Sequence, residues 1–130
     1  MMEMKVTLPG GKRANAHYKG FTVETSAPEG EGGEGTAPAP FDLLLASIGT
    51  CTAVYIAYFC ESRDLPTEDI SLTLRFQWTE KKHLLEKVEV LVHLPPDFPK
   101  QYRKAVIRTA EMCSVKKAFA APPEITVSAA

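Results

Sequence analysis

The chain contains three cysteines, and two of them lie where a reactive thiol could form. Cys51 and Cys113 both sit among small residues, and Cys113 stands at a predicted helix start, where free N–H groups and the helix dipole favour a thiolate. There is no Cys-X-X-Cys motif, and the histidines show no metal-ligand spacing with the cysteines, so no metal site is predicted. The indicated chemistry is a thiolate and a partner thiol that meet only in the fold. The alternative for each cysteine is a small hydrophobic core residue.

Cys60 is predicted to be structural. It follows Cys51 by nine residues on one predicted helix, which separates the two by about half a turn and roughly 13 Å along the axis. A disulfide needs Cα atoms within about 7 Å of each other. Cys51 and Cys60 therefore cannot pair without unwinding the helix.

The helix that carries Cys51 is predicted at residues 40–62. No residue from 43 to 60 is charged, and apolar side chains occur at every helical angle, so the helix should be buried. A membrane span needs about 20 predominantly apolar residues, and small or polar residues interrupt this run near Cys51, so a core helix is favoured. One face of this helix carries small residues at three- and four-residue spacing: Ala46, Gly49, Thr50, Ala53 and Ala57. This spacing indicates that a helix or sheet, from this chain or another subunit, packs closely against that face.

The remaining segments predict an α+β fold in one domain of residues 1–130. Alternation and turn residues indicate an antiparallel meander at residues 1–25, a hairpin at 70–94 and a final strand at 124–128. Helical spacing predicts amphipathic helices at residues 99–121. Residues 26–39, rich in Gly, Pro and Glu, are predicted to form a flexible or extended loop.

Composition excludes several kinds of partner. The net charge is -1, and the lysine pairs at 81–82 and 116–117 are too short to count as basic tracts, so neither nucleic acid nor an anionic membrane is expected. Residues 1–13 lack the apolar run of a signal peptide, and an odd number of cysteines argues against a secreted disulfide framework. A cytoplasmic protein with reduced thiols is expected.

The segments around Cys51 and Cys113 resemble the signature of a known family. PFDLLLASIGTC at residues 40–51, followed by AEMCSV at residues 110–115, is similar to the paired-cysteine signature of the OsmC/Ohr family, the osmotically induced and organic hydroperoxide resistance proteins. The predicted order of strands and helices agrees along nearly the whole chain. The resemblance implies antiparallel sheets wrapped around a long central helix, in an intertwined homodimer with active sites at the interface.

The resemblance also implies a role for each site residue. Cys51 would attack an organic hydroperoxide and become a sulfenic acid, and Cys113 would condense with it to a disulfide that an external dithiol reduces. No bound cofactor is expected. A cation must support the Cys51 thiolate, and in the turn that follows two glycines Arg13 or Lys12 could supply it.

The acid that would orient this cation is displaced in this chain. Characterised members carry a glutamate directly after the proline, where this chain has Phe41, and Asp42 is the acid one residue later. Simpler alternatives are a solvated turn charge for the cation and a helix N-terminal carboxylate for Asp42.

Three functions are open at this point. The first is thiol-dependent reduction of organic or fatty-acyl hydroperoxides in oxidative stress defence, with an apolar pocket lined by Phe41, Leu44, Leu45 and Tyr55. The second is a non-catalytic redox-sensing or apolar-ligand-binding protein on the same dimeric fold. The third is a structural dimer whose cysteines only fill space.

Overall fold

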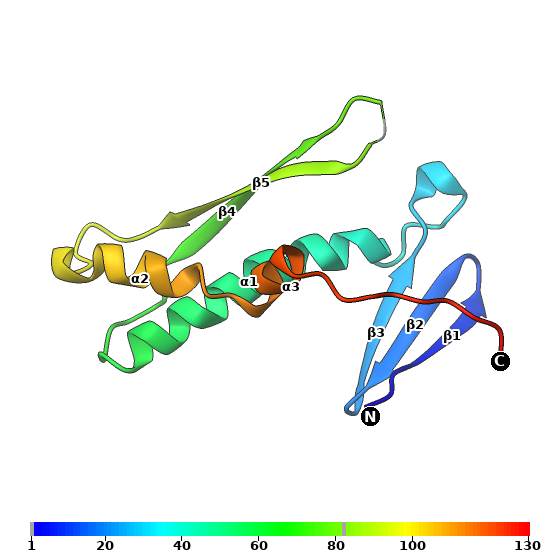
Figure 1. Ribbon diagram of the computed structural model, residues 1–130, viewed down its shortest axis with the longest axis horizontal. Helices are drawn as coiled ribbons and strands as arrows, with labels where there is room; N and C mark the ends of the chain where they lie inside the picture. The colour runs from blue at the N-terminus through cyan, green and yellow to red at the C-terminus, as the bar shows by residue number, and fades with distance from the viewer. Residues whose placement is uncertain (1, 82) are drawn as a thin grey trace. The chain divides into compact units, whose positions relative to one another are not determined.

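The computed structural model describes residues 2–81 and 83–130 and has the predicted α+β architecture, with two antiparallel sheets and one long helix (Figure 1). Predictions that fall on Met1, in the meander, and on Lys82, in the hairpin turn, lie outside the described residues. The chain divides into two compact units, Met1–Ala46 and Ser47–Ala130. The interpretation of residues 1–130 as one domain stays a prediction.

The first unit contains the predicted meander. It is antiparallel and has three strands in sequence order: β1 (Lys5–Gly10), β2 (Arg13–Tyr18) and β3 (Phe21–Ser26). The ring of His17, on the middle strand, forms hydrogen bonds with Thr7 at 3.1 Å and with Thr22 at 3.2 Å. These side chains join all three strands on one face of the sheet.

Residues 26–39 are more ordered than the sequence predicts. A short 3-10 helix, η1 (Glu29–Glu31), turns the segment back, and the Ala27 N–H donates to the Lys12 carbonyl at 2.9 Å. The Gly33 N–H closes a further backbone hydrogen bond within the segment at 3.0 Å, and a Cβ on Gly33 would collide with the Ala27 carbonyl. Apart from η1 the segment after Ser26 contains no helix or strand and is a loop, but backbone hydrogen bonds and a missing side chain fold it back instead of leaving it extended.

Helix α1 (Pro40–Glu61) matches the predicted central helix. Pro40 begins the helix, where its missing N–H costs no hydrogen bond. The Asp42 carboxylate lies in the first turn and accepts the Ala39 N–H at 3.3 Å. A negative charge at this end is favourable, because the first N–H groups of a helix have no partner within it.

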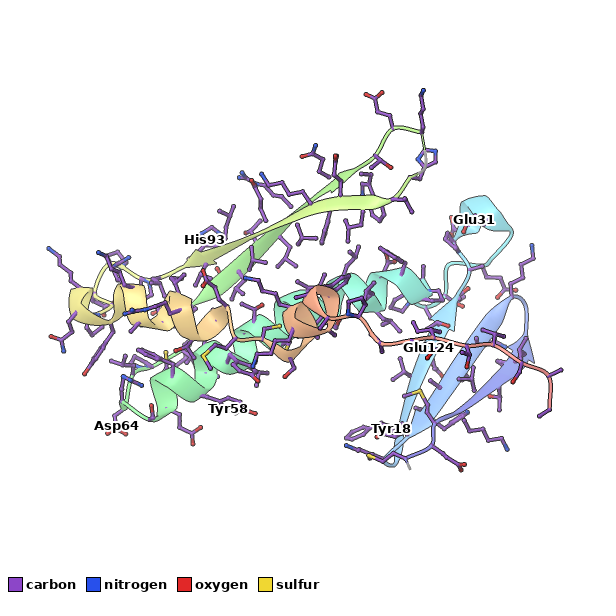
Figure 2. All side chains as sticks on the ribbon, viewed as in Figure 1. Tyr18, Glu31, Tyr58, Asp64, His93 and Glu124 are labelled. Atoms are coloured by element: carbon purple, nitrogen blue, oxygen red, sulfur yellow. The ribbon has the colours of Figure 1, made fainter. Side chains whose placement is uncertain are left out.

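Helix α1 is much less buried than the sequence predicts. Four of its 22 residues are buried within the chain, all on one face: Thr52, Ile56, Phe59 and Cys60. Val54 is 45% exposed, and Tyr58, which projects from the helix away from β4 and β5 (Figure 2), is 62% exposed. Among the described helices, α1 alone is long and apolar enough to cross a membrane. The expectation of burial all round is wrong for the single chain, because its other elements cover one face of the helix.

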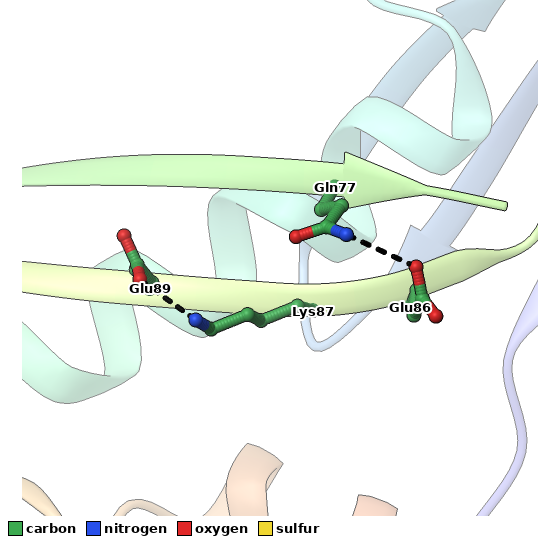
Figure 3. A network of polar contacts seen from close by, with 4 residues as sticks. All are labelled: Gln77, Glu86, Lys87 and Glu89. Atoms are coloured by element: carbon green, nitrogen blue, oxygen red, sulfur yellow. Dashed lines mark hydrogen bonds and ion pairs between the residues drawn. The ribbon is translucent and has the colours of Figure 1, made fainter.

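The second unit contains the predicted hairpin, formed by β4 (Ser71–Trp78) and β5 (Leu85–His93). Its register places apolar residues opposite one another on one face: Leu72 with Val92, Leu74 with Val90, and Phe76 with Val88. Figure 3 shows two polar contacts of the hairpin, one between β4 and β5 and one along β5. Gln77 donates to the Glu86 carboxylate at 3.2 Å, and Lys87 forms an ion pair with Glu89 at 2.9 Å.

Helix α1 and strand β4 approach each other closely at one glycine. A Cβ placed on Gly49 would lie 3.0 Å from Cδ1 and 3.3 Å from Cδ2 of Leu74. These distances are shorter than an ordinary van der Waals contact between carbon atoms, which is about 3.5–4.0 Å. The predicted close approach to the small-residue face is thus observed at Gly49, and the approaching element is a strand of the same chain.

The C-terminal helices complete the core of the second unit. They occupy the region predicted to be helical at residues 99–121: η2 (Lys100–Tyr102), α2 (Arg103–Ala110) and α3 (Ser114–Ala120). The buried core cluster joins α1 to α2 and the segment before η2: Ile56, Phe59, Cys60, Phe98, Val106 and Ala110. Phe59 meets Tyr102 edge to face, with ring centroids 5.8 Å apart.

Residues 124–128 do not form the predicted final strand. Within the described chain no helix or strand follows α3, and Ile125 and Val127 are 83% and 95% exposed. Their alternating pattern is typical of a strand, but a strand forms only where a neighbouring strand can pair with its N–H and C=O groups. No described strand of this chain pairs with the segment, so the prediction is wrong for the single chain.

Candidate functional site

Helix α1 and the start of α3 bring Cys51 and Cys113 together. Cys51 lies near the middle of α1 and is half-buried, whereas Cys113 directly precedes α3 and is 1% exposed. Both are free thiols, and the Cys51 side chain is one of the groups that lower the pKa of Cys113 through hydrogen bonding, which places the two thiols close together. The structure therefore places in contact the two thiols that the sequence singles out.

Cys113 caps the N-terminus of α3. Its Sγ accepts the Lys116 N–H at 3.4 Å. Burial raises the pKa of the Cys113 thiol, but hydrogen bonds outweigh burial and lower this pKa below its ordinary value. These hydrogen bonds come, in decreasing order of effect, from the Lys116 N–H, the Cys51 thiol, the Val115 N–H and the Thr52 hydroxyl. Cys113 therefore ionises more readily than a cysteine in a flexible chain.

Thr52 is a buried polar residue between α1 and Cys113. Its hydroxyl donates to the Ile48 carbonyl at 2.7 Å and also contacts the Cys113 sulfur. A hydroxyl has a single proton, so Thr52 can serve either the carbonyl or a Cys113 thiolate, but not both. The charge on Cys113 and the hydrogen bonding of α1 are thereby linked.

A second contact joins the same two elements. The Tyr55 hydroxyl and the Ser114 hydroxyl lie 3.1 Å apart, in a hydrogen bond between residues far apart in sequence. The sequence did not single out Thr52 or Ser114 as site residues. The available signals were weak: Thr52 adjoins Cys51, and Ser114 adjoins Cys113.

Cys60 lies outside this site. Its side chain is fully buried in the core, and burial raises its thiol pKa, with Arg63 opposing the shift. Arg63 itself stacks on the Phe59 ring, with its guanidinium carbon 3.7 Å from the ring centroid. A raised thiol pKa suppresses the thiolate, so the position is consistent with a structural cysteine.

The predicted cations and acid lie in the first unit. Arg13 Nε donates to the Gly10 carbonyl at 3.1 Å, and Lys12 Nζ donates to the Glu31 carbonyl at 3.2 Å. Across residues 2–81 and 83–130, no ion pair joins Arg13 to Asp42. The Asp42 carboxylate instead accepts the Ala39 N–H at the start of α1. The role of these three residues at the thiols stays a prediction.

A cavity of about 470 Å³ opens beside the thiols in the second unit. Its wall includes Thr52 and Lys116, whose hydroxyl and N–H hydrogen-bond to Cys113. Apolar side chains supply most of the remaining wall: Ile48, Leu85, Val88, Val90, Val92, Ile107, Ala110 and Phe119. The expected lining residues do not contribute to it: Phe41, Leu44, Leu45 and Tyr55. This cavity is therefore distinct from the predicted pocket, because β5 and the C-terminal helices form most of its wall; the pocket lined by the first turns of α1 stays a prediction.

Several solved structures share this fold. One is a protein of Psychrobacter arcticus 273-4 with a proposed role in the osmotic stress and detoxification response; it has a TM-score of 0.78 and 22% identity over 91% of this chain and 88% of that chain. The OsmC-like protein of Mycoplasma pneumoniae has a TM-score of 0.71 and 8% identity, over 94% of this chain and 89% of that chain.

A further similar structure is the organic hydroperoxide resistance protein OsmC of Legionella pneumophila. Its TM-score is 0.58 at 22% identity, over 92% of this chain and 90% of that chain. No curated protein sequence matched the chain. The family model for OsmC-like proteins matches residues 32–128, a segment that contains α1, both thiols and the C-terminal helices. The chain therefore belongs to the OsmC-like protein family.

Proposed function

We propose that the chain is a thiol-dependent reductase of organic hydroperoxides in which Cys51 and Cys113 form the redox pair. The observation that carries the proposal is the close approach of the two thiols, since a disulfide requires its cysteines to be close neighbours. Membership of the family supports a role in peroxide or stress defence. Two of the similar structures are named for detoxification and for organic hydroperoxide resistance.

Cys51 is the thiol that meets the hydroperoxide, because it is the more exposed of the two. Its thiolate attacks the outer oxygen of the hydroperoxide, the O–O bond breaks, and the departing alkoxide takes up a proton to become an alcohol. Cys51 is left as a sulfenic acid, which is the first step of thiol oxidation by peroxides.

Cys113 completes the reaction. Its thiolate, favoured by the lowered pKa, attacks the sulfenic sulfur of Cys51. The S–O bond breaks, hydroxide leaves and is protonated to water, and the S–S bond forms. An external dithiol then reduces the disulfide by thiol–disulfide exchange, so the cycle needs no bound cofactor.

Arg13 is the preferred candidate for the cation that supports the Cys51 thiolate. The described hydrogen bond of Arg13 uses Nε and leaves its terminal nitrogens, which lie farther along the side chain, for another acceptor. Asp42 is proposed to orient Arg13 in place of the acid that the family places at position 41.

We also propose that the protein works as an intertwined homodimer in the cytoplasm. The support for a dimer is the apolar surface that α1 leaves uncovered within one chain, including Val54 and Tyr58. The support for a cytoplasmic location is the chemistry, because a reactive thiol pair needs a reducing compartment to be returned to its dithiol form.

The proposal is tested by the consumption of cumene hydroperoxide with a lipoyl dithiol as reductant. Wild type and a Cys60→Ala control should turn over, and Cys51→Ser should not. Cys113→Ser should react once and stop at the Cys51 sulfenic acid, which dimedone traps. Equal turnover by wild type and Cys51→Ser would remove the enzyme proposal.

A second candidate function is a redox sensor or apolar-ligand-binding protein that does not turn over. The apolar cavity beside the thiols favours it, since such a cavity could hold a ligand whose binding depends on the state of Cys113. In that case the same assay should show one equivalent of hydroperoxide consumed per chain, in the presence and in the absence of the dithiol.

A further inference from the structure

The hydrogen bond between Tyr55 and Ser114 spans the two backbone segments that carry the thiols. Tyr55 follows Cys51 by four residues, about one turn of α1, and therefore lies on the same face of the helix. Ser114 directly follows Cys113 and is the first residue of α3. The 3.1 Å contact between the two hydroxyls thus fastens α3 to α1 beside the redox pair.

Little else holds the start of α3 in place. None of the seven residues of α3 is buried, and Glu111 and Met112, which precede Cys113, are exposed. Apolar burial is what usually fixes a short helix, because the helix itself is marginally stable in water. Among the hydrogen bonds of the described residues, those that tie the start of α3 to α1 are the ones made by the Cys113 side chain and the one between Tyr55 and Ser114.

The geometry of a disulfide makes this placement important. The Cα atoms of paired cysteines lie about 4.4–6.8 Å apart, and the Cβ–S–S–Cβ dihedral is near a right angle. A thiolate must also approach the sulfenic sulfur from the correct direction, and a misplacement of about 1 Å can cost a factor of about a hundred in rate. A helix that moves freely at its first residue would often hold Cys113 outside this range.

We propose that Tyr55 and Ser114 are positioning residues that hold α3 against α1, so that the Cys113 sulfur stays within reach of Cys51. The inference rests on the proposed function in one respect, namely that these two cysteines form the working disulfide. Neither hydroxyl touches the hydroperoxide in this account. They act on the second step, the closure of the disulfide, and leave the first oxidation of Cys51 unchanged.

Disulfide closure after the addition of one equivalent of diamide tests the proposal without any hydroperoxide. Tyr55→Phe and Ser114→Ala each remove one hydroxyl, and each should slow closure about three- to tenfold, the range expected for loss of one hydrogen bond. The double variant should be no slower than either single variant, because both changes remove the same contact. Ser114→Thr keeps a hydroxyl and should restore the rate.

Two further measurements separate positioning from a general loss of structure. In a dithiothreitol redox buffer, the equilibrium constant for disulfide formation should be about three- to tenfold lower in either variant than in wild type, which is the same factor as the slowing of closure. Tyr18→Phe removes a tyrosine hydroxyl from β2 in the first unit and should leave both quantities unchanged. Closure at the wild-type rate in both Tyr55→Phe and Ser114→Ala would overturn the proposal.

The outcome also distinguishes this proposal from the proposed function. If wild type closes the disulfide with diamide but does not consume hydroperoxide, the enzyme proposal fails and the closure rates still decide the role of Tyr55 and Ser114. If wild type does not form the disulfide with diamide, both proposals are overturned.

Discussion

At the scale of the residue, the two thiols of the pair differ in what surrounds them. The sequence suggested that a reactive thiolate would depend on a cationic side chain in the N-terminal hairpin. Around Cys113 the structure provides backbone N–H groups of α3 and two hydrogen-bonding side chains, Cys51 and Thr52. Dipoles fixed in this way stabilise an anion without a neighbouring charged residue.

The lowered pKa of Cys113 gives a direct prediction for the reduced protein. Its thiolate, followed by ultraviolet absorbance, should appear at a lower pH than the value of about 8.5 that is usual for cysteine. This early titration should be absent in Cys113→Ser and shifted upward in Thr52→Val, which loses one of the hydrogen bonds. An unchanged titration curve in Cys113→Ser would assign the thiolate to another residue.

The same shift should appear as a pH dependence of stability. The folded state binds fewer protons than the unfolded state between the lowered pKa of Cys113 and the ordinary thiol pKa, so the free energy of unfolding should rise with pH in that window. The contribution is lost as the pH falls through the folded pKa. Urea unfolding of reduced wild type and Cys113→Ser should therefore differ above this window and converge below it.

At the scale of the elements, the packing of α1 on β4 depends on Gly49. A single Cβ at this position would already meet Leu74 at 3.0 Å, and valine adds two further methyl groups. Gly49→Val should therefore destabilise the chain by about 1–3 kcal/mol through overpacking, as measured by urea unfolding.

A matched control separates packing from helix propensity. Ala57→Val places a valine at an exposed position of the same helix and should cost at most about 0.7 kcal/mol in helix propensity, whereas Gly49→Val costs no helix propensity, because glycine is the poorer helix former. Combining Gly49→Val with Leu74→Ala should recover part of the lost stability, because the smaller side chain vacates the overlap. Equal stability of Gly49→Val and Ala57→Val would contradict the close packing.

The elements that the sequence predicted well are those with a strong internal pattern. Helix α1 and the hairpin follow from local periodicity, whereas the pairing of Leu74 with Val90 comes from the structure. The sequence does not predict the order of residues 26–39, because it depends on a backbone contact from Ala27 to Lys12 in the turn between β1 and β2. The segment at 124–128 was assigned as a strand from its pattern, which carries no information on whether a neighbouring strand is present.

The candidate site likewise contains residues that could be predicted from the sequence and residues that could not. The two thiols could be predicted as partners, because their residue type and surroundings stand out in the sequence. Thr52 and the Tyr55–Ser114 contact could not, because hydroxyl groups are common and a hydrogen bond between residues distant in sequence leaves no spacing pattern.

At the scale of the whole molecule, the uncovered surface of α1 predicts a dimer. Val54 is 45% exposed, so an aspartate there would face water in a single chain and change the helix propensity little, because valine and aspartate are similar helix formers. In a dimer that covers α1, the same charge would be buried without a partner, which is strongly unfavourable. We expect wild type to sediment as a dimer and Val54→Asp to dissociate.

The control is an equally exposed apolar residue away from α1. Leu84, near the end of the hairpin turn, is 56% exposed, and Leu84→Asp should remain dimeric in the same sedimentation experiment. A monomeric wild type, or a Val54→Asp variant that stays dimeric, would contradict the covering of α1 by a second chain.

The limited burial of α1 also bears on how a newly made chain matures. Both thiols lie in the second unit of one chain, so the redox pair can assemble within that chain before any partner is met. The apolar side of the helix would stay in water until two chains associate, so the dissociated chain would be prone to aggregate. The fraction of chains that reach the dimer would then depend on the protein concentration. Expression level, as well as sequence, would then set the yield of functional protein.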